Sequence, residues 1–146
     1  MLFRSRQAWR YLVVPLHRAV VDAGAQEVAA VTPASGAGEM PTWRLTVGDP
    51  EHPIAMAEVT LGREGCAVLW WLEVEPGRRG RGIGRRVLLQ ALRFLALRGA
   101  RTVGAFVDHD AGHERDRRPA LRLFASVGFQ EIDRLRSYES PRRRPR

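Results

Sequence analysis

An apolar run that ends in a turn of glycine and arginine constrains this chain more than any other feature. Cys66 to Val74 reads CAVLWWLEV, and the next ten residues read EPGRRGRGIG. A nearly continuous apolar run is typical of a strand buried on both faces of a sheet. Pro76 does not continue such a strand, and apolar side chains recur at helical spacing from about Gly82 to Arg98. The sequence therefore predicts a strand, a tight turn and a helix.

The glycines of this turn suit a phosphate ligand. Gly80, Gly82 and Gly84 can take positive φ angles and let a ligand approach the main chain closely. The start of the following helix offers unpaired N–H groups and the positive end of the helix dipole, which together favour phosphate. The spacing does not fit the G-x-G-x-x-G of a dinucleotide-binding fold, and the Gly-Lys-Ser/Thr of a P-loop is absent from the sequence.

Arginine content alone carries little weight, because all 24 basic residues are arginine and none is lysine. The formal net charge of +8 favours polyanionic partners, such as phosphorylated small molecules or nucleic acid. A single cysteine excludes an internal disulfide and a cysteine-based zinc site. No stretch approaches the roughly 20 apolar residues of a membrane helix, so we expect a cytoplasmic protein without a membrane partner.

The chain divides into four regions by pattern. In residues 1–30, apolar side chains lie three or four positions apart, which predicts a helical region. Residues 31–42 are small and turn-rich and are predicted to form a loop. Residues 43–139 alternate strands with helices and form the core of one domain, and residues 140–146 are predicted to be a disordered basic tail.

Trp70 and Trp71 stand side by side in the apolar run. Because side chains alternate along a strand, we expect these two on opposite faces of the sheet, with at least one of them in the core. The other is a candidate wall of an acceptor pocket.

Two segments together resemble the GNAT (Gcn5-related N-acetyltransferase) superfamily. LEVEPGRRGRGIGRRVL resembles its motif A, in which Arg79, Gly82 and Gly84 match the pattern Q/R-x-x-G-x-G/A. ALRLFASVGF, which begins at Ala120, resembles motif B, A-x-x-L-Y-x-x-x-G-F. The resemblance covers residues 43–139. It implies an α/β (α+β) fold, with a GNAT-like mixed central β-sheet flanked by helices.

The resemblance also implies a function. The chain would transfer the acetyl group of acetyl-CoA to a primary amine of a small molecule or peptide, by direct attack and without a metal. Turn amides would hold the pyrophosphate, and the pantetheine arm would enter a gap between the strands at 66–74 and 102–107 and pair with main chain there. The residues implied for binding acetyl-CoA are Leu72, Val74, Arg79, Gly80, Arg81, Gly82, Ile83, Gly84, Arg85 and Phe124.

Two departures from the family pattern matter. Phe124 stands where motif B often has a tyrosine that protonates the leaving thiolate, and a phenyl ring cannot donate that proton. Family members usually have a further strand after the one that starts here at Phe129. The sheet of this chain is therefore expected to be a candidate for lacking that last strand. The contribution of residues 1–30 to the sheet stays open.

Two residues are candidates for the catalytic base. Glu73 lies beside the proposed thioester site, and a carboxylate buried among its apolar neighbours would hold a proton more readily than in water. Strand alternation can also point Glu73 away from the acceptor, as a partly exposed carboxylate paired with an arginine. His109 follows the strand at 102–107 and has an imidazole suited to proton transfer near neutral pH, with a solvated loop as its alternative.

Three functions therefore remain open. The first is the N-acetyltransferase, and the second is a non-catalytic acyl-CoA-binding module on the same fold. The third is a basic nucleic-acid-binding protein, which the glycine register disfavours, because nucleic-acid backbones do not require a strand, turn and helix with G-x-G-x-G. A homodimer is compatible with each of them.

Overall fold

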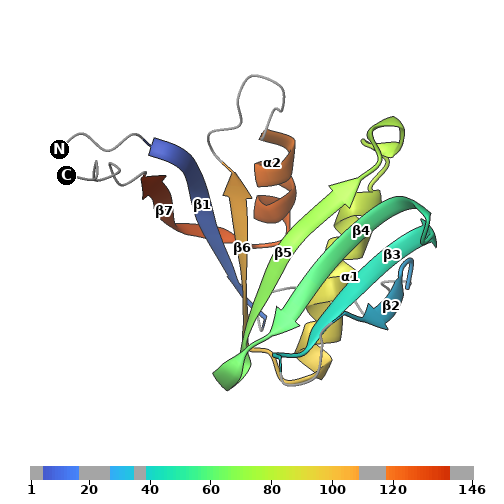
Figure 1. The fold of residues 1–146 in the computed structure, drawn as a ribbon, viewed down its shortest axis with the longest axis horizontal. Coiled ribbons are helices and arrows are strands. Elements are labelled where there is room, and N and C mark those ends of the chain that lie inside the picture. The colour runs from blue at the N-terminus through green and yellow to red at the C-terminus, as the bar shows by residue number, and fades with distance from the viewer. Residues whose placement is uncertain (1–4, 17–26, 35–38, 109–117, 139–146) are drawn as a thin grey trace, which may run out of the picture.

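The structure is a computed structural model that describes residues 5–16, 27–34, 39–108 and 118–138, with the backbone alone at 5–9, 108 and 133–138. Its strands form one sheet in the order β2-β3-β4-β5-β6-β1-β7 (Figure 1). The strands are β1 (Ser5–Pro15), β2 (Ala30–Pro33), β3 (Thr42–Asp49), β4 (His52–Leu61), β5 (Cys66–Val74), β6 (Thr102–Asp108) and β7 (Gln130–Tyr138). The helices are α1 (Ile83–Leu97) and α2 (Arg118–Ser126), with short 3-10 turns at Arg63–Gly65 and Pro76–Arg78. This confirms the predicted mixed sheet with helices.

The helical region predicted for residues 1–30 is wrong over residues 5–15, which form β1. Leu12, Val14 and Leu16 are buried while the residues between them are only partly covered, which is the period of two of a strand. The apolar residues of this segment fit helical spacing as well. The segment forms a strand because its backbone is hydrogen-bonded to strands on both sides, and because β-branched and aromatic residues, in which it is rich, favour strands.

β1 also bears on the further strand that family members usually have after the one starting here at Phe129. β1 lies between β6 and β7 and is antiparallel to both, so β7 pairs with a strand from the start of the chain. The predicted loop at 31–42 is wrong at both ends, because β2 ends at Pro33 and β3 begins at Thr42. These two strands pair with each other. The tail at 140–146 lies outside the described residues.

Both helices lie on one face of the sheet. α1 connects β5 to β6, which are parallel neighbours and need such a crossover. Phe94 of α1 packs edge-on against Trp43 of β3, with ring centroids 5.0 Å apart. Leu123 of α2 lies 3.5 Å from the position that a Cβ on Gly84 of α1 would take, so α2 is on the same side. Neither helix has the length and apolarity to cross a bilayer.

A buried glutamine ties α1 to the segment before β2. Among the buried side chains of α1, only Gln90 is polar. Its Oε1 accepts hydrogen bonds from the N–H groups of Val28 (3.0 Å) and Ala29 (2.9 Å), and its Nε2 donates to the carbonyl oxygen of Ala29 at 2.8 Å. This side chain therefore satisfies main-chain groups that the fold has taken away from water.

The substitution Gln90→Leu should lower the free energy of unfolding by roughly 2–4 kcal/mol, because it leaves buried N–H and C=O groups without partners. Urea unfolding measures the change. Gln130→Leu is the matched control, since Gln130 is exposed on β7 and its loss should change stability by less than about 0.5 kcal/mol. Equal midpoints for the two variants would contradict the structural role of Gln90.

Candidate functional site

β5 and β6 separate part of the way along their length. Their pairing runs from Cys66 and Thr102 to Leu69 and Ala105 and then stops, although both strands continue beyond it. Past this point β5 pairs with β4 alone and β6 with β1 alone. Figure 1 shows the two strands diverging toward their C-terminal ends. Backbone groups that face this gap have no partner strand among the described residues.

A β-bulge in β5 marks the start of the gap. Glu58 of β4 pairs with Trp71, while the next residue, Val59, pairs with Leu69, so Trp70 is the extra residue of β5. A bulge shifts the alternation of side chains by one position. After the bulge, each side chain of β5 therefore points to the face opposite to the one that regular alternation would give it.

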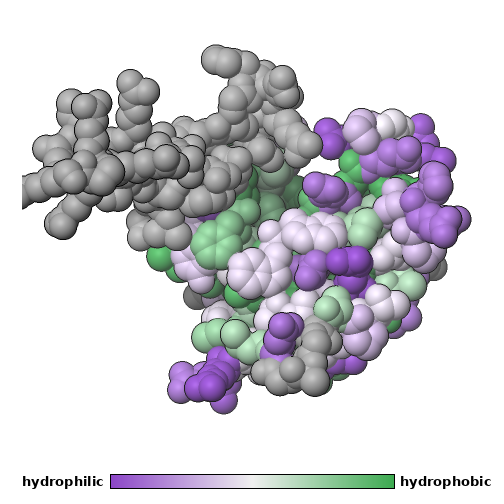
Figure 2. Space-filling model, viewed as in Figure 1, coloured by the Kyte–Doolittle hydropathy of each residue, from purple (hydrophilic) through white to green (hydrophobic). Residues whose placement is uncertain are grey.

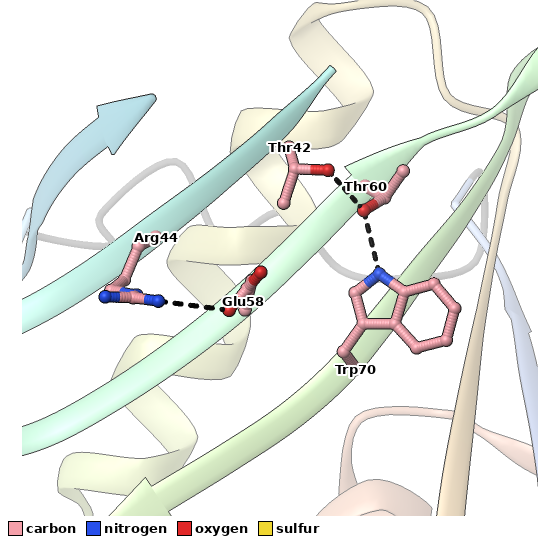
Figure 3. Close-up of polar contacts among 5 residues, drawn as sticks. All are labelled: Thr42, Arg44, Glu58, Thr60 and Trp70. Atoms are coloured by element: carbon pink, nitrogen blue, oxygen red, sulfur yellow. Dashed lines mark hydrogen bonds and ion pairs between the residues drawn. The ribbon is translucent and has the colours of Figure 1, made fainter. Parts of the chain in front are cut away.

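The two tryptophans consequently share one face, and the prediction that they lie on opposite faces is wrong. Trp70 Nε1 donates to Thr60 Oγ1 at 2.8 Å, and the ring of Trp71 lies 5.9 Å from the guanidinium carbon of Arg44. Arg44 is also ion-paired with Glu58 at 3.5 Å. Figure 3 shows Trp70, Thr60, Arg44 and Glu58 on the face of the sheet opposite α1. We call this the open face.

Leu72 and Val74 turn their main-chain groups into the gap. Glu75 N–H donates to the carbonyl oxygen of Ile54 at 2.8 Å, which places Val74 at a non-hydrogen-bonded position relative to β4. Its own N–H and C=O, and those of Leu72 two residues earlier, therefore point toward β6. The oxygen of Val74 accepts a bond from Arg79 Nε at 3.1 Å. The two N–H groups face the gap, where the described residues supply no strand to bond them.

The glycine turn leads from the end of β5 into α1. Gly82 is the N-cap of α1 with φ 78° and no side-chain cap, and Gly80 has φ 77°. The first helical bond joins Arg86 N–H to Gly82 O (3.2 Å), so the N–H groups of the three residues between them have no partner in the helix. A Cβ on Gly82 would meet open space, whereas one on Gly84 would lie 3.4 Å from Val74 Cγ2. Gly82 thus has a backbone conformation that favours glycine, whereas a Cβ on Gly84 would make only ordinary van der Waals contact with β5.

Arginines surround this turn, and all of them are exposed. They are Arg78, Arg79, Arg81, Arg85 and Arg86. Figure 2 shows hydrophilic side chains gathered at this end of the molecule. Arg78 Nε lies 3.9 Å from Glu75 Oε2, but Arg81, Arg85 and Arg86 have no ion pair within the described part of the chain. An anion at the start of α1 would meet positive charge that no carboxylate in the described ranges neutralises.

The two candidate bases have different outcomes. Glu73 lies on the open face, because its neighbour Val74 points to α1, and it pairs across the sheet with Met56. It is exposed, so the burial that argued for it is not present. The alternative, an ion pair with an arginine, is not present either, because no arginine of the described residues pairs with Glu73. His109 lies outside the described residues.

Phe124 is the buried residue of α2 and lies in the core. It is 7% exposed, and its ring packs edge-on against Phe129 with centroids 5.0 Å apart. Its expected contact with the coenzyme stays a prediction, and the ring leaves little free surface for one. No group of three or more histidine, cysteine, aspartate or glutamate side chains suited to a metal occurs in the residues that the structure describes.

An aromatic pair beside the gap was not among the residues predicted from the sequence. Tyr11 of β1 and Phe106 of β6 are cross-strand partners with ring centroids 5.0 Å apart. Phe106 is 37% exposed, whereas Ala105 and Val107 on either side of it are buried. Alternation along this strand places Phe106 on the face opposite to Ala105 and Val107, so the sequence of β6 could have indicated its position.

Comparison with known proteins gives a consistent result. The model of the acetyltransferase (GNAT) family matches residues 22–129. A mycothiol acetyltransferase of a Nocardioides species is 37% identical over 60 residues, which is 41% of this chain and 18% of that protein.

Similar solved structures share the fold at low sequence identity. A tandem GNAT protein from the clavulanic acid biosynthesis pathway has a TM-score of 0.68 at 15% identity, over 97% of this chain and 56% of that one. A GCN5-related N-acetyltransferase from Sphaerobacter thermophilus has a TM-score of 0.58 at 14% identity, over 92% and 51%. The chain spans less than two thirds of the length of each of these relatives.

Proposed function

The chain belongs to the acetyltransferase (GNAT) family, and we propose that it transfers the acetyl group of acetyl-CoA to a primary amine. The observation that carries the proposal is the separation of β5 and β6 beside an uncapped helix start. Among the residues that the structure describes, this arrangement leaves a strand edge without a partner strand for an extended chain and, next to it, N–H groups outside the helical hydrogen bonds for phosphate. Acetyl-CoA has that form and supplies the acetyl group as a thioester.

The proposed donor site uses main chain more than side chains. Phosphate oxygens would accept hydrogen bonds from the free N–H groups at the start of α1, with Arg81 and Arg85 as charged partners. Amides of the pantetheine arm would pair with Leu72 and Val74, in the manner of an added strand. Both sets of groups belong to elements of the sheet and of α1, so they are ordered before the donor arrives.

The proposed reaction has one bond-forming step. The amine nitrogen bonds to the thioester carbonyl carbon, the C–S bond breaks, and coenzyme A leaves as a thiolate. An N–H group of Leu72 or Val74 in the gap would stabilise the oxyanion. Glu73 would take the proton of the amine, directly or through water. Phe124 cannot protonate the thiolate, so water would supply that proton.

Thermal unfolding with acetyl-CoA tests the donor. A concentration of about 100 Kd should stabilise the protein by about 2.7 kcal/mol, which raises Tm by roughly 5–10 °C for a chain of this size. Unchanged Tm at millimolar acetyl-CoA would reject the proposal. Release of coenzyme A with a panel of primary amines then tests the transfer itself.

A non-catalytic acyl-CoA-binding module is the second candidate. Phe124 favours it, because this buried ring replaces the hydroxyl that often protonates the thiolate in the family. Stabilisation by acetyl-CoA without coenzyme A release for any amine would support this second function over the first.

A further inference from the structure

Three aromatic residues follow or adjoin the point where the gap opens. Leu69 and Ala105 form the last pair between β5 and β6, and the next residues of these strands are Trp70 and Phe106. Phe106 pairs in turn with Tyr11 of β1. We call Trp70, Phe106 and Tyr11 the aromatic surface.

The aromatic surface belongs to the open face. Ala105 and Val107 are buried on the side of the helices, so Phe106 between them points the other way, and Tyr11 stacks on it. Trp70 reaches the same face through its bond to Thr60 (Figure 3). Apolar and weakly polar surface is visible in this part of the molecule in Figure 2.

These rings are held in place by the sheet. The indole N–H of Trp70 is fixed by Thr60 Oγ1, which is itself 2.7 Å from Thr42 Oγ1. The hydroxyl of Tyr11 lies 2.8 Å from the position that a Cβ on Gly104 would occupy, so the absent side chain makes room for the ring. Rings fixed in this way lose little further freedom when a ligand stacks on them.

Two of these rings are fixed and yet exposed. Trp70 is 51% and Phe106 is 37% exposed. Scattered exposed apolar side chains need no explanation, but neighbouring rigid rings at the mouth of a ligand gap offer a stacking surface.

A carboxylate stands on the same face. Glu73 follows Trp70 by three residues on β5, and the bulge at Trp70 leaves both side chains on the open face. Glu58 on this face is already paired with Arg44, whereas Glu73 has no ion pair among the described residues. A ligand with a ring at one end and an ammonium group at the other matches this order of partners.

We infer that the acceptor is a primary amine joined by a short chain to an aromatic ring. This inference rests on the proposed acetyl transfer. The ring stacks on the aromatic surface, and the amine lies toward Glu73 and the gap in which the thioester is held. Trp70 and Phe106 then act as binding residues that select the acceptor.

A matched set of amines tests this substrate class. The set comprises 2-phenylethylamine, 2-cyclohexylethylamine and propylamine, which differ in the ring but keep the primary amine. Turnover at limiting acceptor, measured as kcat/KM, should be highest for the phenyl compound and about tenfold or more lower for propylamine. Equal values for the phenyl compound and propylamine overturn the inference.

Variants connect the preference to the aromatic surface. Trp70→Ala should raise KM for 2-phenylethylamine about tenfold with little change for propylamine, and Trp70→Phe should recover most of the loss. Leu97→Ala is the control, because Leu97 is an apolar side chain of α1 that is 75% exposed and outside the aromatic surface. Equal KM values for the Trp70→Ala variant and the wild type contradict the inference.

A binding measurement separates this inference from the proposed function. Ligand-observed NMR should show 2-phenylethylamine contacting the wild-type protein, with a weaker signal for the Trp70→Ala variant. Stabilisation by acetyl-CoA must be retained in that variant, which shows that it is folded. Stabilisation of the wild type without a contact of the phenyl compound overturns the acceptor class alone, whereas absence of stabilisation in the wild type rejects acetyl transfer.

Discussion

Gly82→Ala is expected to weaken acetyl-CoA binding by more than about tenfold, a loss of at least 1.4 kcal/mol of binding free energy. Gly82 has a φ of 78°, which an alanine adopts only at a cost of roughly 1–2 kcal/mol. The new methyl group would also project into open space beside the free N–H groups of α1, where the proposed phosphates lie. Isothermal titration or the shift of Tm with acetyl-CoA measures the loss.

Gly99→Ala is the matched control for this substitution. Gly99 follows the opposite end of α1, has a φ of 92°, and would also place a Cβ in open space. The two variants thus share the cost in backbone conformation but differ in their distance from the start of the helix. Similar losses of acetyl-CoA affinity would mean that Gly82 matters for stability alone and that the proposed phosphate site is wrong.

The strand at 66–74 and the helix that follows were predictable because independent signals agree there. Apolar continuity defines the strand, Pro76 and the glycines end it, and helical spacing resumes at once. The glycine register also predicted the turn, since Gly80 and Gly82 do take positive φ values. Local sequence determines such features, because the residues that specify them are the ones that adopt them.

β1 was not predictable in the same way. Its apolar residues fit periods of two and of 3.6, and the choice depends on β6 and β7, which lie about a hundred residues further along the chain. The bulge at Trp70 is a similar case, because it is a property of the pairing between β4 and β5. A rule of strict alternation therefore placed Trp71 on the wrong face.

The residues of the proposed donor site are easier to find from the sequence than those of the proposed acceptor site. The proposed donor residues follow one another in the chain from Leu72 to Arg85, so a single motif contains them. The aromatic surface joins Tyr11, Trp70 and Phe106 from three strands. The order of strands in the sheet brings these residues together, and that order is not evident from the amino-acid sequence.

Glu73→Gln is expected to lower kcat about 10²–10⁴-fold while the stabilisation by acetyl-CoA stays as in the wild type, because an amide keeps the shape of the side chain but cannot accept a proton. Single-turnover acetylation of a primary amine measures the step. Glu58→Gln is the control, since it removes the same charge from the open face at a carboxylate already paired with Arg44. If both variants raised KM alone, Glu73 would attract the ammonium group without acting as the base. If only Glu73→Gln lowered kcat, the exposed carboxylate would be the group that takes the proton, and burial would not be required for that role.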